Sequence, residues 1–336
     1  MDDKKILDFM LKNPNLNDKT KKTYQIRLAE IKKFMNNETL DYIIHNPIEY
    51  WEKMNIHCDS RPGRLGSSKI GISKRDGLTK AIYSLFNNNP DLKDKEETLF
   101  KKWQEISLNT QNIIQNQQDS NEASERQKKA YVSLEFIKDQ RDKLPHGTQD
   151  RLLLSMYTMI PPVRNNYWHM RIYNSKEEYD KEWTSKIKND KLEKEQGEEN
   201  FLLLKENIIY LQTYKTRKKY GIIEINIPEE LKAEILISLE KKPRKYLFTN
   251  FRNKEFITSD AFSKFSAIVL RSYLGNKDIS LTTIRHIYLI DAENKLKDMT
   301  VNERKEISNT MAHSLETQLR YLWHNLGNEL VMIDEL

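Results

Sequence analysis

Three short apolar runs decide the fold class of this chain: Phe201-Leu-Leu-Leu, Asn207-Ile-Ile-Tyr-Leu-Gln and Gly221-Ile-Ile-Glu-Ile-Asn-Ile-Pro. Each run has the length and the branched or aromatic side chains of a β-strand, and polar residues separate the runs. A turn is expected near Lys215–Gly221, which would make the second and third runs a hairpin. The sequence therefore predicts one small antiparallel sheet.

Helical periodicity surrounds these strands. Residues 174–200 interrupt it as a charged segment with few apolar side chains, which reads as an exposed loop or a frayed helix. One predicted helix ends before Pro161-Pro162, because proline cannot continue a helix. The helices expected in this half of the chain are 131–143, 148–159, 229–240, 258–273, 281–296, 302–312 and 314–325.

The first 120 residues are expected to be helical throughout. The clearest pattern lies at 18–35, with Asp18 or Thr20 as the cap of the helix. Its apolar face would carry Tyr24, Leu28, Ile31 and Phe34, and its opposite face is basic. The other helices expected here are 4–12, 48–56, 74–87 and 94–116.

A polar, aperiodic segment at 117–127 marks the boundary between the two halves. We therefore expect a helical domain at 1–120, a linker at 121–128 and a second domain at 129–336 that ends in a C-terminal tail. The predicted fold class is mainly α with a small antiparallel β-sheet, arranged in two domains. A length of 336 residues fits two domains, each with its own core.

The composition describes a chain with a wide charged surface. Charged residues make up 32% and hydrophobic residues 38% of the chain, and the net charge is +6. This mild excess suits a nucleic acid held in a local groove, but an ordinary lysine-rich soluble protein would have the same charge.

Several classes of chemistry are not expected from this sequence. Cys58 is the only cysteine, which excludes an intramolecular disulfide and a cysteine-based zinc site, and favours a reducing intracellular compartment. The chain shows no glycine-rich phosphate loop, and no run approaches the roughly 18 apolar residues of a membrane span. Its opening residues lack the apolar segment of a secretion signal. We expect no cofactor and no metal.

One set of residues points to phosphate chemistry: Arg285, His313 and Tyr321 near the end of the chain, with Arg164 and Lys215 upstream. Two arginines can hold the oxygens of a phosphate and stabilise the charge that builds on them. A phenol has an ordinary pKa of about 10 and needs help to attack phosphorus. This set therefore suggests breaking and rejoining of DNA through a tyrosine nucleophile.

Each of the other candidate residues could take more than one role. His313 can donate to the phosphate oxygens or accept the phenolic proton. Lys215 can protonate the departing 5′ oxygen, although Arg217, Lys218 or Lys219 could take that role. His286 either contacts phosphate or serves the structure of the site.

The chain resembles the tyrosine recombinases, which include phage and mobile-element integrases. The resemblance covers about 129–325 and rests on Thr158-Met-Ile-Pro-Pro-Val-Arg164, Thr213-Tyr-Lys215-Thr-Arg-Lys-Lys, Ile284-Arg285-His286, Met311-Ala-His313-Ser and Tyr321. It implies a helical core-binding domain at 1–120, a catalytic domain at 129–336, and catalytic roles for Arg164, Lys215, Arg285, His313 and Tyr321. The pair Pro161-Pro162 is most similar to recombinases of large DNA viruses and their mobile elements.

Three positions depart from the family pattern. Thr282 stands where the family has histidine or lysine, and Tyr167 replaces an acidic residue. The spacing between His313 and Tyr321 is one residue shorter than the commonest one. Thr282 is kept as a possible supporting residue together with His286, and its presence predicts reduced or retuned activity.

Contacts with double-stranded DNA are expected from basic side chains in three places. The first is the polar face of the 18–35 helix, the second is a segment rich in glycine, serine and cations at 60–75, and the third is the turn after Lys215. The residues are Lys21, Lys22, Arg61, Arg64, Lys69, Lys74, Arg75, Arg217 and Lys218.

The resemblance implies a site-specific recombinase or integrase that forms a 3′-phosphotyrosyl bond on Tyr321. It also implies a homotetramer on DNA in which the tail, residues 322–336, docks on a neighbouring protomer. Two alternatives remain open. A type IB topoisomerase would use the same chemistry as a monomer, and a catalytically weak DNA-binding relative would fit Thr282 and Tyr167. We expect the protein in the cytoplasm, the nucleus or a viral replication site of a host cell.

Overall fold

The computed structural model describes residues 2–60, 72–87, 93–94, 96–188 and 199–322. The chain divides into two compact units, Met1–Ser120 (unit 1) and Asn121–Leu336 (unit 2), and each has its own hydrophobic core. Within the described ranges, no helix is both long enough and apolar enough to cross a membrane.

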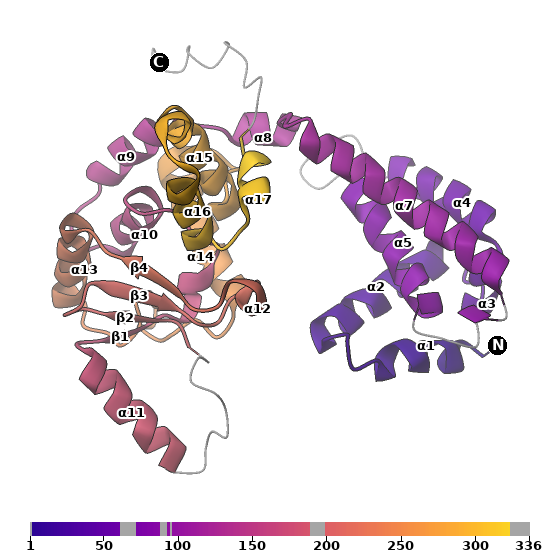
Figure 1. The fold of residues 1–336 in the computed structure, drawn as a ribbon, viewed down its shortest axis with the longest axis horizontal. Helices are drawn as coiled ribbons and strands as arrows, with labels where there is room; N and C mark the ends of the chain where they lie inside the picture. The colour runs from indigo at the N-terminus through magenta and orange to yellow at the C-terminus, as the bar shows by residue number, and fades with distance from the viewer. Residues whose placement is uncertain (1, 61–71, 88–92, 95, 189–198, 323–336) are drawn as a thin grey trace. The chain divides into compact units, whose positions relative to one another are not determined.

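Unit 1 is built from helices in its described part, as Figure 1 shows. Trp103 lies at the centre of its core with no exposed surface, and its indole N–H donates to the backbone carbonyl of Ile44 over 2.8 Å. The helices are α1 (Asp3–Lys12), α2 (Asp18–Phe34), α3 (Leu40–His45), α4 (Pro47–Ser60), α5 (Ile72–Asn87) and α7 (Glu97–Asp119).

The apolar face predicted for α2 is the face that packs. Leu28 and Ile31 are buried, and Tyr24 and Phe34 lie against the same core. The cap differs from the prediction, because the side chain of Asn17 accepts the N–H of Thr20 over 2.9 Å. A short helix that was not predicted, α3, lies between α2 and α4.

Unit 2 combines helices with one sheet. Its elements before and within the sheet are α8 (Glu125–Ala130), α9 (Leu134–Asp142), α10 (Gln149–Thr158), η1 (Asn166–His169), β1 (Arg171–Tyr173), α11 (Lys176–Lys188), β2 (Phe201–Leu203), β3 (Ile208–Leu211), α12 (Arg217–Tyr220) and β4 (Ile223–Asn226). The helices after the sheet are α13 (Glu229–Lys241), α14 (Ser259–Leu274), α15 (Leu281–Asp298), α16 (Val301–Thr310) and α17 (Leu315–Leu319).

The three predicted strands are present as β2, β3 and β4, but the sheet is mixed where the sequence predicted an antiparallel one. Its order is β1-β2-β3-β4, and β1 pairs with β2 in parallel. The additional strand reads Arg-Ile-Tyr and has a single aliphatic residue, so it lacks the apolar run that marks β2 in the sequence. The backbone at Lys245–Leu247 pairs with the other edge of β1.

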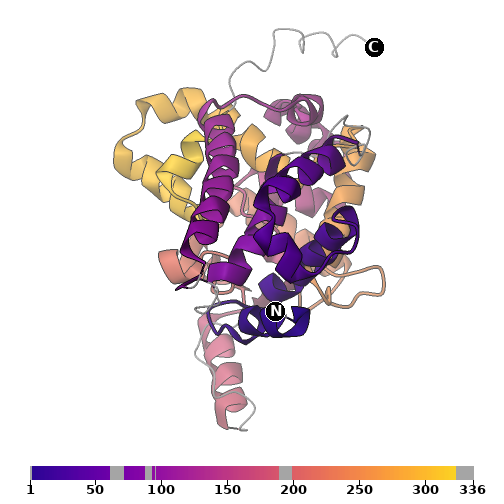
Figure 2. The ribbon, with the colours of Figure 1, turned by 90° about the vertical axis from the view of Figure 1, so that its right-hand side faces the viewer.

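The charged segment at 174–200 contains a helix that packs on the sheet. Tyr179 and Trp183 of α11 are almost fully buried, and the ring of Tyr179 stacks on Phe201 of β2 with centroids 4.0 Å apart. The rest of α11 extends away from the sheet in Figures 1 and 2. Two aromatic side chains one turn apart therefore anchor a helix in a segment whose composition suggested an exposed loop or a frayed helix.

The predicted boundary segment is partly helical. Helix α7 continues to Asp119, three residues into the segment at 117–127, and α8 begins at Glu125. Ser124 caps α8 and exchanges hydrogen bonds with Gln127, which explains why a polar segment can begin a helix.

The last described helix is shorter than predicted. The sequence predicted a helix at 314–325, whereas α17 ends at Leu319. The N–H groups of Tyr321 and Leu322 then donate to carbonyls three residues back instead of four. Tyr321 consequently lies in a turn just past α17, and most of the predicted tail lies outside the described residues.

Candidate active site

Arg285 lies at the centre of the site, on α15, with no exposed surface. One terminal nitrogen donates to the carbonyl of Pro162 over 2.8 Å, and the other donates to the carbonyl of Met311 over 3.0 Å. Arg285 therefore joins the turn that precedes Arg164 to the turn that precedes His313. Burial lowers the pKa of its guanidinium, and the neighbouring Tyr321 side chain opposes that effect.

The turn that presents Arg164 is braced by two buried tyrosines. The hydroxyl of Tyr157, on α10, donates to the carbonyl of Arg164 over 2.5 Å. The ring of Tyr167 meets that of Tyr157 edge to face, with centroids 5.6 Å apart. The tyrosine that replaces the acidic residue of the family pattern is thus a packing residue under the arginine turn.

His313 lies in a tight turn between α16 and α17, and only 3% of its surface is exposed. Ala312 before it adopts φ 58°, a left-handed conformation that is uncommon for any residue but glycine. Burial and the charge of Arg285 lower the pKa of His313 to about 4. The imidazole is therefore neutral at pH 7.

The contacts of His313 decide its tautomer. Its Nδ1 lies 3.1 Å from the carbonyl of Ser314, and a carbonyl oxygen only accepts hydrogen bonds. A neutral ring has a single N–H, so Nδ1 must hold the hydrogen and Nε2 must be an acceptor. Among the residues that the structure describes, this buried Nε2 has no hydrogen-bond partner.

Tyr321 is held by its ring. The phenol stacks on the imidazole of His286 with centroids 4.1 Å apart, and on that of His313 with centroids 5.3 Å apart. The guanidinium carbon of Arg285 lies 5.5 Å from the centre of the same ring. The structure thus brings the predicted nucleophile together with three predicted site residues.

His286 contacts the main chain of Tyr321 as well as its ring. Its Nδ1 lies 3.0 Å from the carbonyl of Tyr321, and burial lowers its pKa to about 4. By the argument used for His313, the neutral ring donates from Nδ1. His286 therefore positions the tyrosine, which agrees with the structural alternative considered for it.

Lys215 is near this cluster but does not join it. It lies exposed in the turn between β3 and α12. The hydroxyl of the next residue, Thr216, donates to the carbonyl of Ala312 over 3.1 Å. This bond ties the basic turn to the turn of His313. Arg217, Lys218 and Lys219 follow on α12, so the choice among the four cations stays open.

Thr282 lies one turn before Arg285 on α15 and is exposed. It lines a pocket of about 330 Å³ together with His286 and the start of α8. Thr282 and His286 therefore border the same pocket.

The predicted DNA contacts lie in varied surroundings. Lys22 is exposed and Lys21 half-buried on α2, and Lys218 is exposed on α12. Lys74 forms an ion pair with Glu30, and Arg75 forms one with Asp59 over 2.6 Å. Arg61, Arg64 and Lys69 lie outside the described residues. All of these assignments stay predictions.

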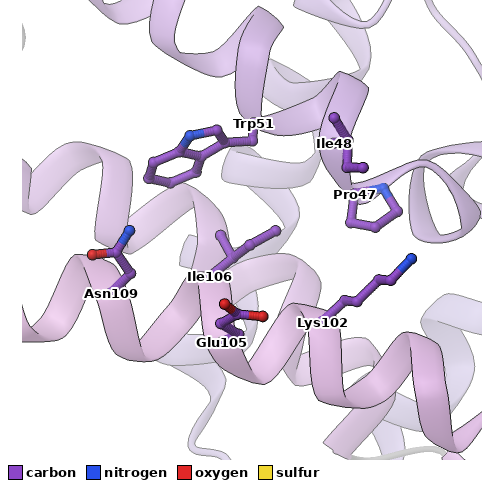
Figure 3. Close-up of a pocket in the computed structure, with 7 residues that line it drawn as sticks. All are labelled: Pro47, Ile48, Trp51, Lys102, Glu105, Ile106 and Asn109. Carbon is purple, nitrogen blue, oxygen red and sulfur yellow. The ribbon is translucent and has the colours of Figure 1, made fainter.

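Unit 1 has a shallow pocket between α4 and α7, shown in Figure 3. Its volume is about 350 Å³, and Ile48 on its rim is 67% exposed. The other lining residues are Pro47, Trp51, Lys102, Glu105, Ile106 and Asn109.

Three residues that organise the site were not singled out by the sequence. Tyr157 sits in an apolar helical run where nothing distinguishes it from a core residue. Thr216 and Ala312 act through main-chain geometry, one by its bond to a carbonyl and the other by its positive φ. Next to these two residues, the sequence pointed only to their neighbours Lys215 and His313.

Comparisons with known proteins place few constraints on this chain. No protein-family model and no curated protein sequence matches it. Among solved structures it is similar to a crystal structure of XerA recombinase, with 14% identity and a TM-score of 0.38, over 96% of this chain and 94% of that chain. A similarity of this degree shows nothing about the chemistry of this chain, which depends on the residues of the site.

The arrangement can bind an anion beside a phenol. The Nε–H of Arg285 is a buried donor with no partner among the described residues. The Nε2 of His313 is a buried acceptor that also has no partner among them. Buried polar groups are nearly always paired, and each exception asks for an explanation. Both atoms belong to side chains that lie against the ring of Tyr321.

Proposed function

We propose that this protein breaks and rejoins DNA as a site-specific recombinase or integrase, with Tyr321 as its nucleophile. The proposal is carried by two buried atoms beside the phenol, Arg285 Nε–H and His313 Nε2, for which the described part of the chain provides no hydrogen-bond partner. The donor suits a phosphate oxygen and the acceptor suits the phenolic proton. A phosphodiester at this place would satisfy the donor.

The proposed reaction is an exchange of one phosphoester for another. The Tyr321 oxygen attacks phosphorus as its proton passes to His313 Nε2, and the bond from phosphorus to the 5′ oxygen breaks. That oxygen takes a proton from Lys215 or a neighbouring cation and leaves as a hydroxyl. Arg164 and Arg285 stabilise the charge on the non-bridging oxygens. The 3′-phosphotyrosyl bond conserves the energy of the broken strand for rejoining.

A nicked duplex tests the chemistry. A strand break placed just after the cleavage site lets the released fragment diffuse away, so that a covalent adduct accumulates. Because the target sequence is unknown, we would use a randomised duplex pool and identify the modified peptide by mass spectrometry. We expect the modified peptide to carry a nucleotide bound covalently to Tyr321. The Tyr321→Phe variant should form no adduct.

The matched control is Tyr288→Phe. Tyr288 lies on α15 one turn after Arg285 and belongs to the packing around the site, so its hydroxyl should be dispensable. An adduct that persists in Tyr321→Phe, or one found on another residue, would refute the proposed nucleophile.

One observation favours a second candidate function, a DNA-binding relative with weak catalysis. Each terminal nitrogen of Arg285 already donates one of its two N–H groups to a backbone carbonyl, so this side chain has fewer N–H groups left for a phosphate than an arginine without such partners. Salt-dependent binding to duplexes, with no adduct from any member of the pool, would support this second function over the first.

The proposed enzyme would act on double-stranded DNA as a homotetramer, in which the segment after Tyr321 docks on a neighbouring protomer. Mobile or viral DNA is the substrate we propose for it. Exchange of strands between two marked duplexes would support this assignment. Relaxation of arbitrary supercoiled plasmid by a monomer would identify a type IB topoisomerase instead.

A further inference from the structure

The connection between α13 and α14 contains a turn, Asn250–Glu255, that its own hydrogen bonds build. The N–H of Asn250 donates to the carbonyl of Lys254 over 2.8 Å, which closes the turn at its base. The Asn250 side chain accepts the N–H of Arg252 over 2.9 Å, and Asn253 adopts φ 57°. The turn is therefore a defined structure, in which the side chain of Asn250 bonds within the turn and that of Asn253 bonds Thr249 and Pro243 beside it.

Aromatic side chains fix both ends of this turn, while one in the middle is exposed. Phe248 and Phe256 are 0% and 5% exposed, and their rings pack on Phe262 of α14 with centroids 5.4 and 5.5 Å apart. Phe251, in contrast, is 88% exposed. The packing of unit 2 does not account for a phenylalanine displayed on an ordered turn.

The surroundings of Phe251 are mainly cationic. Arg252 and Lys254 are exposed on the same turn, and the guanidinium of Arg252 lies 5.2 Å from the centre of the Phe251 ring. Glu255 is the one exposed carboxylate of the turn. Such a surface suits a nucleic acid, because a base can stack on the aromatic ring while the phosphates contact the two cations.

The turn also leads to the candidate active site within unit 2. It is followed by Thr258, whose side chain caps α14. One turn along α14, the hydroxyl of Ser263 accepts a hydrogen bond of 3.3 Å from the side chain of Asn165. Asn165 is the residue after Arg164, so a strand lying over Arg164 would pass close to this helix.

We infer that Phe251 stacks on a DNA base while Arg252 and Lys254 contact the phosphates beside it. This inference rests on the proposed function for its choice of partner and adds a second contact to the same substrate. Phosphate contacts position a nucleic acid, and stacking is tolerant of sequence, so the turn would strengthen binding without reading bases.

The test measures binding of the full chain to a mixed-sequence duplex with a short single-stranded gap that carries 2-aminopurine. We expect Phe251→Ala to weaken binding roughly fivefold to a hundredfold, the range found for loss of one base stack. It should also abolish the change in 2-aminopurine fluorescence. Phe251→Trp should preserve both, whereas Phe251→Leu should behave like alanine because leucine has no π face.

Ile257→Ala is the matched control, since Ile257 is 86% exposed just after the turn but has no ring to stack. Unchanged affinity in Phe251→Ala would overturn the inference, and so would full binding by Phe251→Leu. A change in sedimentation of Phe251→Ala at unchanged DNA affinity would assign the turn to a protein interface instead.

The outcomes separate this inference from the proposed function. If no adduct ever forms but Phe251→Ala weakens binding, only the proposed chemistry fails. If the adduct forms equally in Phe251→Ala and its affinity is unchanged, only the stacking contact fails.

Discussion

At the scale of single residues, His313 shows how burial sets the chemistry of the site. An imidazole on the surface titrates near 6.5, but burial and the charge of Arg285 lower the pKa of His313 to about 4. A neutral ring whose Nδ1 is held by a carbonyl has its lone pair on Nε2. The side chain is therefore neutral at pH 7 and presents a lone pair, while the low pKa makes it a weak base.

The lowered pKa predicts a pH dependence of stability. Between pH 6.5 and about 4 the unfolded chain binds a proton at His313 and the folded chain does not, so stability is lost as the pH falls through this window. We expect the wild-type protein to lose up to roughly 3 kcal/mol more than His313→Asn over this range. Scanning calorimetry of both full-length proteins measures the difference, and parallel pH profiles would contradict it.

At the scale of elements, the site depends on contacts between turns that are far apart in sequence. The hydroxyl of Thr216, between β3 and β4, holds the carbonyl of Ala312, between α16 and α17. The contact joins the predicted proton donor Lys215 to the predicted base His313. A change at Thr216 should therefore affect catalysis only by shifting Lys215 and His313 relative to each other.

We expect Thr216→Val to slow formation of the covalent adduct about fivefold to tenfold, the effect of losing roughly 1 kcal/mol of hydrogen bonding. Single-turnover kinetics on a nicked duplex measures the rate. Amide hydrogen exchange at 212–222 should rise in the same variant, which is a readout that does not need activity. Thr216→Ser keeps the hydroxyl and serves as the control. Equal rates in wild type and both variants would contradict the positioning role of this hydrogen bond.

The elements that the sequence could predict are those with a repeating apolar pattern. The buried face of α2 and the strands β2 to β4 follow from such patterns. The strand β1 has one aliphatic residue and α11 is anchored by two aromatic side chains, and neither gives an apolar run or period in the sequence.

The sequence could predict that several candidate side chains lie together, but it could not predict the contacts that hold them. Arg285, His286, His313 and Tyr321 come together as expected from their chemistry. The partners of Arg285 are backbone carbonyls, which every residue has, so no residue type marked Pro162 or Met311. Tyr321, just past the end of α17, is likewise held through its backbone carbonyl, which accepts a hydrogen bond from the His286 ring.

At the scale of the whole molecule, charge is spread over both units while the net charge is only +6. DNA binding would then depend on local groups of cations, each of which releases counterions when it meets a phosphate. The basic face of α2 is such a group in unit 1, far in sequence from the active site.

Replacing Lys21 and Lys22 together by alanine should weaken binding to any duplex and flatten its salt dependence. Two lost phosphate contacts reduce the slope of log affinity against log salt by roughly 1.8. Fluorescence anisotropy at several salt concentrations measures the slope. Lys101→Ala is the control, since Lys101 pairs with Glu97 on the exposed side of α7. A slope equal to that of wild type would remove α2 from the DNA-binding surface.

The way Arg285 is bound has a consequence for how this sequence can change over time. Its two carbonyl partners belong to the main chain, so the side chains at positions 162 and 311 can be exchanged without removing an acceptor. No other side chain offers N–H donors on three nitrogens in one rigid plane, so position 285 has no equivalent substitute. Substitutions at 162 and 311 should therefore keep these two hydrogen-bond acceptors, whereas a substitution at 285 should remove both hydrogen bonds.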